Sequence, residues 1–195
     1  MVDRPEVRRR HSPGGGVRIF VAAYPPAAVV EALCTSARGI EGLPPSRWTP
    51  PDQVHLTLLF VGEVEPRRVD AVIESAERAA AGIGAFSLAL DRLITLPERG
   101  PARLVAAAVP EAFPLTELVG RLAHRLATHR RKERARGSER FLPHLTLLRF
   151  RSPAARFAVD AAISPTPFAV DRIAVMRSTL TREGAEHREL REIAL

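Results

Sequence analysis

Several residue types are scarce in this sequence of 195 residues, and each scarcity excludes a class of protein. Cys34 is the only cysteine, so the chain cannot form an internal disulfide or a cysteine-rich metal cage, and it fits a reducing compartment. No apolar run approaches the roughly 18 residues that span a bilayer, and residues 1–16 lack the apolar segment of a signal peptide. We therefore expect a cytoplasmic protein with no membrane partner.

Lysine is nearly absent as well. Lys132 is the only one, so arginine carries almost all of the positive charge behind the formal net charge of +7. The planar guanidinium pairs bidentately with phosphate, which favours an anionic partner. A GC-rich genome, indicated by abundant Ala, Pro, Gly and Val, would give the same composition. The charge therefore allows an acidic substrate without identifying one.

The chain is expected to fold as one domain over residues 17–195, after a disordered tail over residues 1–16 that contains three consecutive glycines. Irregular segments are predicted at 42–53, which is rich in proline, and at 130–140, which is highly charged, and a short irregular or helical piece is predicted at 151–167. Hydrophobic periodicity predicts strands at 17–23, 54–61, 86–96, 103–109, 144–150, 168–178 and 187–195, and helices at 25–39, 66–81 and 111–132. Because helices and strands do not alternate regularly, the pattern indicates an α+β fold.

An internal repeat is the most informative feature: HLTLL occupies residues 55–59 and again residues 144–148. Both copies fall on predicted strands, and such self-similarity indicates repeated architecture, here two related lobes. Side chains alternate along a strand, so His55 and Thr57 share one face, and His144 and Thr146 share the equivalent face. An approximate two-fold axis would direct both polar pairs into one cleft.

Two histidines that face each other are suited to phosphodiester chemistry. The unperturbed pKa of histidine is about 6.5, so one imidazole can accept a proton from water while the other donates one to a leaving ribose oxygen. The threonine hydroxyls would stabilise the charge of the pentavalent transition state. A single HLT on a strand is most simply a surface histidine, but two matched copies favour a catalytic pair. Zinc fits less well, because no third ligand stands in recognisable spacing beside either motif, and no metal or cofactor is expected.

At these residues the sequence resembles the 2H phosphoesterases, and within them the bacterial RNA 2',3'-cyclic phosphodiesterases, also called 2'-5' RNA ligases. Four segments are similar to family segments in their order and spacing: RIFVAA at 18–23, RWTPPDQVHLTLLFVGEV at 47–64, RFLPHLTLLRF at 140–150 and FAVDRIAVMRSTLTREGAEHREL at 168–190. The resemblance implies an α+β fold in which two pseudo-symmetric lobes, with antiparallel sheets and outer helices, surround a central cleft.

The resemblance also implies roles for individual residues. His55 is expected to be the general acid and His144 the general base, with Thr57 and Thr146 binding phosphate. Arg149 matches a basic family position that is directed at the substrate phosphate or ribose. It stands five residues after His144, which is the wrong parity for the same strand face, so this role requires a bulge, a twist or a long reach.

Two aromatic positions are open to more than one interpretation. Phe20 matches a family aromatic that could stack on a base, and core packing is an equal alternative. His187 departs from the family, which often has a tyrosine there. The implied activity is metal-independent hydrolysis of the 2',3'-cyclic phosphate at RNA 3' ends to a 2'-phosphate by a monomer, and the same site would run ligation in reverse. A non-catalytic RNA-binding module, suggested by the basic run at 129–140, and an enzyme for a small cyclic nucleotide are the alternatives.

Overall fold

The computed structural model describes residues 16–127, 129, 142–181 and 184–195, and these residues form helices and strands in irregular succession. The predicted α+β class is confirmed. The elements follow the order β1 (Val17–Ala23), α1 (Ala27–Arg38), β2 (Ser46–Trp48), η1 (Pro51–Gln53), β3 (Leu56–Val64), η2 (Pro66–Arg68), α2 (Val69–Ala80), β4 (Phe86–Leu96), β5 (Ala102–Ala108), α3 (Phe113–Leu126), β6 (His144–Ala154), β7 (Asp160–Val170), β8 (Arg172–Leu180) and β9 (Ala185–Ala194).

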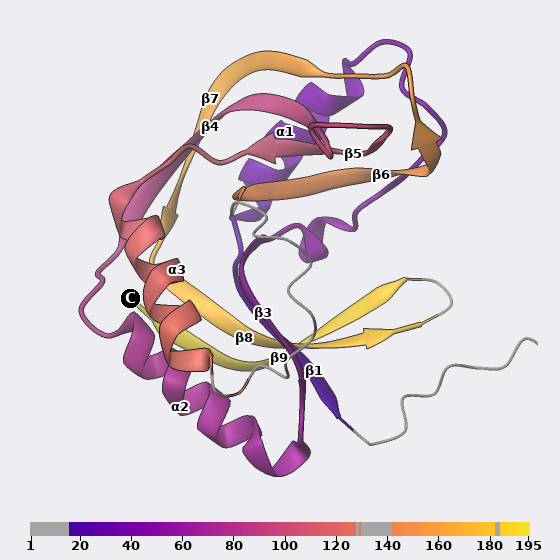
Figure 1. Cartoon of the computed structure of the whole chain (residues 1–195). Helices are drawn as coiled ribbons and strands as arrows, with labels where there is room; N and C mark the ends of the chain where they lie inside the picture. Colours follow the sequence, from indigo (N-terminus) through magenta and orange to yellow (C-terminus); the bar gives the residue numbers. More distant parts are fainter. Residues whose placement is uncertain (1–15, 128, 130–141, 182–183) are drawn as a thin grey trace, which may run out of the picture.

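The strands form an antiparallel sheet in the order β7-β4-β5-β6-β3-β1-β8-β9, with β2 paired to β6. This sheet divides into two lobes, β7-β4-β5-β6 and β3-β1-β8-β9, which are drawn above one another in Figure 1. The lobes meet at one register pair, Leu56 of β3 opposite Leu145 of β6. Both leucines hold the second position of the HLTLL repeat, so an approximate two-fold axis passes between them. The predicted pair of pseudo-symmetric lobes is confirmed.

Each lobe is covered by a helix that follows a strand of the other lobe. The units β1-α1-β3 and β5-α3-β6 are equivalent; α1 contacts β6 and β7, whereas α3 contacts β3. Helix α2 lies beside α3, and both cover the lower lobe in Figure 1. A continuous apolar core joins these helices to one face of the sheet, with fully buried Leu33 in α1 and Leu118 and Leu122 in α3. Burial of each leucine contributes about 1.5–3 kcal/mol, so the core fixes both lobes on one scaffold.

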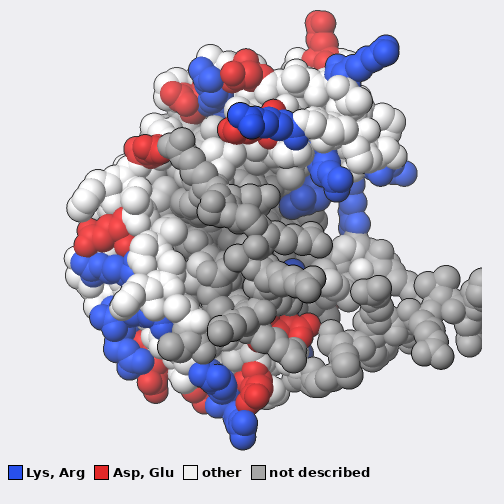
Figure 2. Space-filling view, viewed as in Figure 1, with Lys and Arg blue, Asp and Glu red and all other residues white. Residues whose placement is uncertain are grey.

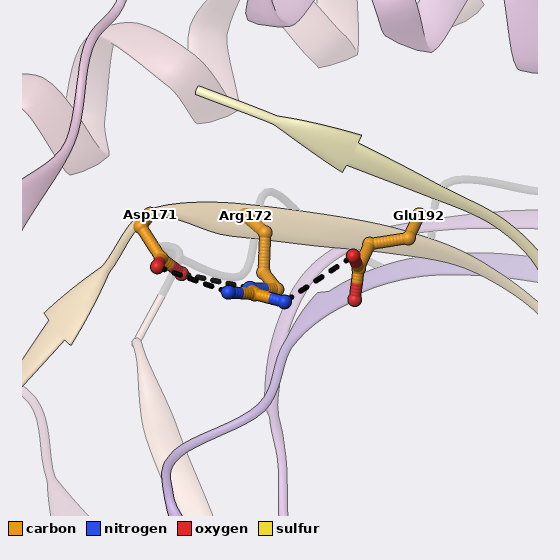
Figure 3. Close-up of polar contacts among 3 residues, drawn as sticks. All are labelled: Asp171, Arg172 and Glu192. Atoms are coloured by element: carbon orange, nitrogen blue, oxygen red, sulfur yellow. Dashed lines mark hydrogen bonds and ion pairs between the residues drawn. The ribbon is translucent and has the colours of Figure 1, made fainter.

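One predicted strand is in fact two strands. The single strand expected at 168–178 is interrupted at Asp171, because β7 ends at Val170 and β8 begins at Arg172 in the other lobe. Arg172 contacts carboxylates on both sides: its Nε lies 2.9 Å from Oδ1 of Asp171, and its Nη1 lies 3.3 Å from Oε1 of Glu192 (Figure 3). Exposed ion pairs add little stability. Their position nevertheless marks the point at which the chain passes from one lobe to the other.

Two segments predicted as irregular contain strands. Strand β7 includes Pro165 and Pro167, and it tolerates them because it lies at the edge of the sheet, where one side makes no ladder hydrogen bonds. Strand β2 lies within the proline-rich segment 42–53.

The other predicted helices and strands are confirmed with ends shifted by a few residues. The helix predicted at 111–132 ends earlier than expected, because α3 ends at Leu126 and both Ala127 and His129 form a turn. The predicted tail before Gly16 and the charged segment at 130–140 lie outside the described residues. No described helix is both long and apolar enough to cross a membrane.

Candidate active site

The two copies of the repeat lie side by side where the lobes meet. On either side of the Leu56–Leu145 pair, the antiparallel arrangement brings His55 toward Thr146 and Thr57 toward His144. Both leucines are fully buried in the main core. The histidines and threonines are partly exposed, and alternation along each strand places them on the opposite face of the sheet. The structure therefore brings together the four residues that the repeat singles out.

Each threonine lies opposite an alanine on the neighbouring strand. Thr57 is opposite Ala22 of β1, and Thr146 is opposite Ala106 of β5. Both alanines belong to small apolar clusters that are separate from the main core. They occupy the middle of a second repeat, Val-Ala-Ala at 21–23 and 105–107, which the sequence analysis missed. A three-residue repeat does not stand out in an alanine-rich chain. The signal that was available is that one Val-Ala-Ala copy lies on the predicted strand before each HLTLL motif.

The two histidines are anchored in the same way. Nδ1 of His55 lies 2.7 Å from the carbonyl oxygen of Gln53, and Nδ1 of His144 lies 2.8 Å from the carbonyl oxygen of Leu142. A carbonyl oxygen only accepts hydrogen bonds, so Nδ1 carries the hydrogen in each ring. Nε2 is thereby left to accept or donate a proton, as an acid or a base requires. In both cases the carbonyl comes from two residues earlier, so the anchor is part of the repeated local structure.

Aromatic rings surround His55. The ring centroids of Phe20, Tyr24 and His187 lie 5.2, 5.5 and 5.2 Å from that of His55. Phe20 is only 2% exposed, so its ring has little open face for a base, which supports the packing alternative over stacking. Phe60 lies next to it, with ring centroids 6.0 Å apart, and is 58% exposed. Of these two phenylalanines, Phe60 is therefore the one whose ring is open to a ligand.

The environment of His55 disfavours its charged form. Burial lowers the pKa of His55 to about 4, against the opposing effect of the hydrogen bond to Gln53. The positive charges of His187, His144 and Arg149 lower the pKa further. This electrostatic coupling reflects the closeness of these groups to His55. In the free protein at neutral pH, the His55 ring is uncharged.

Two polar atoms beside His55 have no hydrogen-bond partner among the described residues: the Tyr24 hydroxyl and Nδ1 of His187. Burial, with smaller effects from Glu189 and Asp52, raises the pKa of Tyr24 to about 12, so the hydroxyl keeps its hydrogen. Burial also lowers the pKa of His187. An unsatisfied buried polar group costs about 1–3 kcal/mol, which a polar ligand would offset. The sequence analysis missed Tyr24, although its position two residues after Ala22 was an available signal.

A bulge in β6 explains how Arg149 can lie on the same strand face as His144 and Thr146, although its spacing from His144 has the wrong parity. The pairing of β5 with β6 skips Leu147, so that Thr146 lies opposite Ala106 and Arg149 lies opposite Leu104. Ala106 and Leu104 are two residues apart and share a face, and directly opposite residues also share a face. Arg149 therefore lies on the same face as Thr146. This is the bulge that the family resemblance required.

The same bulge in the other lobe puts a different side chain at the equivalent position. The pairing of β1 with β3 skips Leu58, which matches Leu147 in the repeat, and Phe60 lies opposite Phe20. Phe60 is thus the counterpart of Arg149. The shared face carries an exposed aromatic ring on one lobe and a guanidinium on the other.

Comparison with known proteins assigns the chain to a family. Residues 25–182 match the 2'-5' RNA ligase superfamily. The chain belongs to this superfamily. The resemblance seen in the two HLTLL motifs is therefore confirmed, and the face that carries both histidines lies within a 2H phosphoesterase fold.

Similar proteins span most of the chain. An RNA 2',3'-cyclic phosphodiesterase of Thermus thermophilus is 30% identical over 193 residues, covering 92% of this chain and 90% of that protein. One of Thermotoga maritima is 27% identical over 148 residues, covering 74% and 77%. A solved Thermus thermophilus structure has a TM-score of 0.78 and 28% identity, covering 91% of this chain and 97% of that one. E. coli LigT in its apo form has a TM-score of 0.71 and 26% identity, covering 92% and 98%, and LigT has also been solved in complex with 3'-AMP.

Proposed function

We propose that the chain is an RNA 2',3'-cyclic phosphodiesterase that hydrolyses terminal cyclic phosphates to 2'-phosphates. The observation that carries this proposal is the identical anchoring of His55 and His144 on one face, each with Nδ1 on a local carbonyl and Nε2 left for proton transfer. The names of the Thermus and Thermotoga relatives support the substrate class. RNA 3' ends are the proposed partners.

In the proposed reaction, Nε2 of His144 accepts a proton from water, and the water oxygen attacks phosphorus. The bond from phosphorus to the 3' oxygen breaks, and Nε2 of His55 gives its proton to that oxygen. Thr57 and Thr146 donate hydrogen bonds to the non-bridging phosphate oxygens. The assignment of acid and base rests on the family resemblance.

This direction requires a charged His55 although burial lowers the pKa of His55 to about 4. A phosphate bound beside the ring supplies the negative charge that raises this pKa, and Arg149 would bind the same phosphate with its planar fork. Phe60 offers its exposed face for stacking on the terminal base. When a 5'-hydroxyl takes the place of water, His144 accepts the proton of that hydroxyl, its oxygen attacks phosphorus, and His55 protonates the departing 3' oxygen, so the same site supports ligation through a 2'-5' bond.

The test is turnover of an oligonucleotide ending in a 2',3'-cyclic phosphate, with excess chelator present. His55→Ala and His144→Ala are each expected to lose about 10² to 10⁴ in rate. His124→Ala, which removes an exposed histidine from α3, is the matched control and should keep the wild-type rate. Full activity in either site variant would contradict the acid-base pair, and loss of wild-type activity with chelator would contradict the metal-independent mechanism. Binding of RNA without turnover would instead support the non-catalytic alternative.

A further inference from the structure

A second arginine extends the site beyond Arg149. Arg47 of β2 lies directly opposite Arg149 of β6, and opposite residues of an antiparallel pair share a face. Strand β2 pairs with the same edge of β6 that meets β3 at Leu145. Arg47 therefore stands on the catalytic face, at the boundary between the lobes and farther along β6 than the histidines.

The guanidinium of Arg47 reaches the other lobe. A Cβ atom added to Gly184, which precedes β9, would lie 3.4 Å from Nη1 of Arg47. Gly184 has a φ of +138°, a conformation that L side chains rarely adopt. The absence of a side chain at this position lets the guanidinium lie against the backbone. The Arg47 side chain thus extends across the junction of the two lobes.

The two arginines form a cationic pair that has no acidic partner among the described residues. Neither side chain makes an ion pair or hydrogen bond with any residue that the structure describes. Like charges opposite each other destabilise a sheet, and desolvation lowers the pKa of Arg149, so the pair is unfavourable on its own. Figure 2 shows basic side chains gathered at the lower right margin of the upper lobe, with no acidic side chain among them. An anion bound at this place would stabilise the pair.

We propose that Arg47 binds the phosphate on the 5' oxygen of the terminal nucleotide, while Arg149 contacts the reacting phosphate. The substrate is then the end of a polynucleotide, whose next phosphodiester occupies the Arg47 subsite, rather than a free nucleoside cyclic phosphate. This inference rests on the proposed function. It adds a subsite that detects whether the RNA chain continues on the 5' side of the terminal nucleotide. The subsite recognises phosphate and not the identity of a base.

The test compares adenosine 2',3'-cyclic phosphate with the same molecule carrying a 5'-phosphate. The wild type is expected to prefer the 5'-phosphorylated substrate by about tenfold or more in kcat/KM, as one charge-assisted hydrogen bond provides. Arg47→Ala should reduce this preference to about one, and Arg47→Lys should retain part of it because Lys keeps the charge but not the planar fork. On an oligonucleotide substrate, Arg47→Ala should also flatten the dependence of log KM on log salt by about 0.7.

Arg67→Ala is the control, because it removes one positive charge from an exposed residue beyond the far end of β3. It should keep the wild-type preference. A wild type that turns over both substrates equally, or an Arg47→Ala variant that keeps the preference while unfolding at the wild-type temperature, would overturn the Arg47 subsite and leave the proposed function intact. A wild type that turns over neither these two substrates nor an oligonucleotide ending in a 2',3'-cyclic phosphate would overturn both.

Discussion

Acidification should destabilise the folded protein through His55. Burial is the main cause that lowers the pKa of this ring from 6.5 to about 4, so the folded state resists a proton that the unfolded chain accepts. A proton taken up preferentially by the unfolded chain favours unfolding. The stabilisation is therefore fully present above pH 6.5 and is lost as the pH falls from 6.5 toward about 4.

The two pKa values set the size of the effect. Their difference corresponds to about 3 kcal/mol in the free energy of unfolding once the pH is below both values. About 2 kcal/mol of this should be lost between about pH 7 and about pH 5, where the unfolded chain is protonated at this position and the folded protein is not. A loss of that size is a large fraction of the stability of an ordinary domain.

Urea unfolding at pH 7 and pH 5 measures this loss. His55→Gln removes the imidazole that would take up the proton and leaves the other titrating groups in place. Those groups contribute similarly to both proteins, so their contribution cancels when the two losses are compared. The wild type should lose about 2 kcal/mol more than His55→Gln over this range. Equal losses in the two proteins would show that folding does not shift the pKa of His55, and the reasoning from burial would be wrong.

Two further predictions concern substrate contacts and proton transfer. Phe60→Leu is expected to raise KM for a nucleotide substrate by about 5- to 100-fold with little change in kcat, because stacking on a base is worth about 1–3 kcal/mol. Steady-state kinetics check this against Phe113→Leu, which alters the other exposed phenylalanine among the described residues, on α3, and should leave KM unchanged; equal KM values in the two variants would contradict stacking. With a substrate analogue that has sulfur at the 3' bridging position, the single-turnover deficit of His55→Ala should shrink at least about tenfold, because a leaving thiolate needs no general acid. If the deficit of His144→Ala shrinks instead, the acid and base are exchanged.

The repeat made the centre of the fold predictable, because its alternation is local. Leu56 and Leu145 are apolar neighbours of polar residues, and that alone indicates which face each side chain takes. The alternation fails at the fourth letter, where Leu58 and Leu147 are bulged. Neither bulge contains a glycine or a proline, so no residue type marks it. The face of Arg149 depends on that bulge and could not be deduced from its spacing.

The boundaries between lobes were also hidden, because they depend on pairing between distant segments. Asp171 lies inside an apolar, strand-like run, and no glycine or proline stands next to it to signal that β7 ends there. Strand β2 is three residues long and lies among prolines, so only its partner β6 defines it. Arg47 belongs to this short strand. Its place on the face that carries both histidines therefore becomes visible only with the register of β6.

The departures from symmetry fit an asymmetric substrate. A phosphate presents similar oxygens to both lobes, and the identical histidine and threonine pairs match it. A nucleotide does not share this symmetry, and the equivalent positions Phe60 and Arg149 differ accordingly. Alignment of the two Val-Ala-Ala repeats also makes Tyr24 the counterpart of Ala108, which lies opposite His144. A bulky ring therefore covers His55, whereas a methyl group lies opposite His144, and unequal surroundings are what give two chemically identical groups different roles in proton transfer.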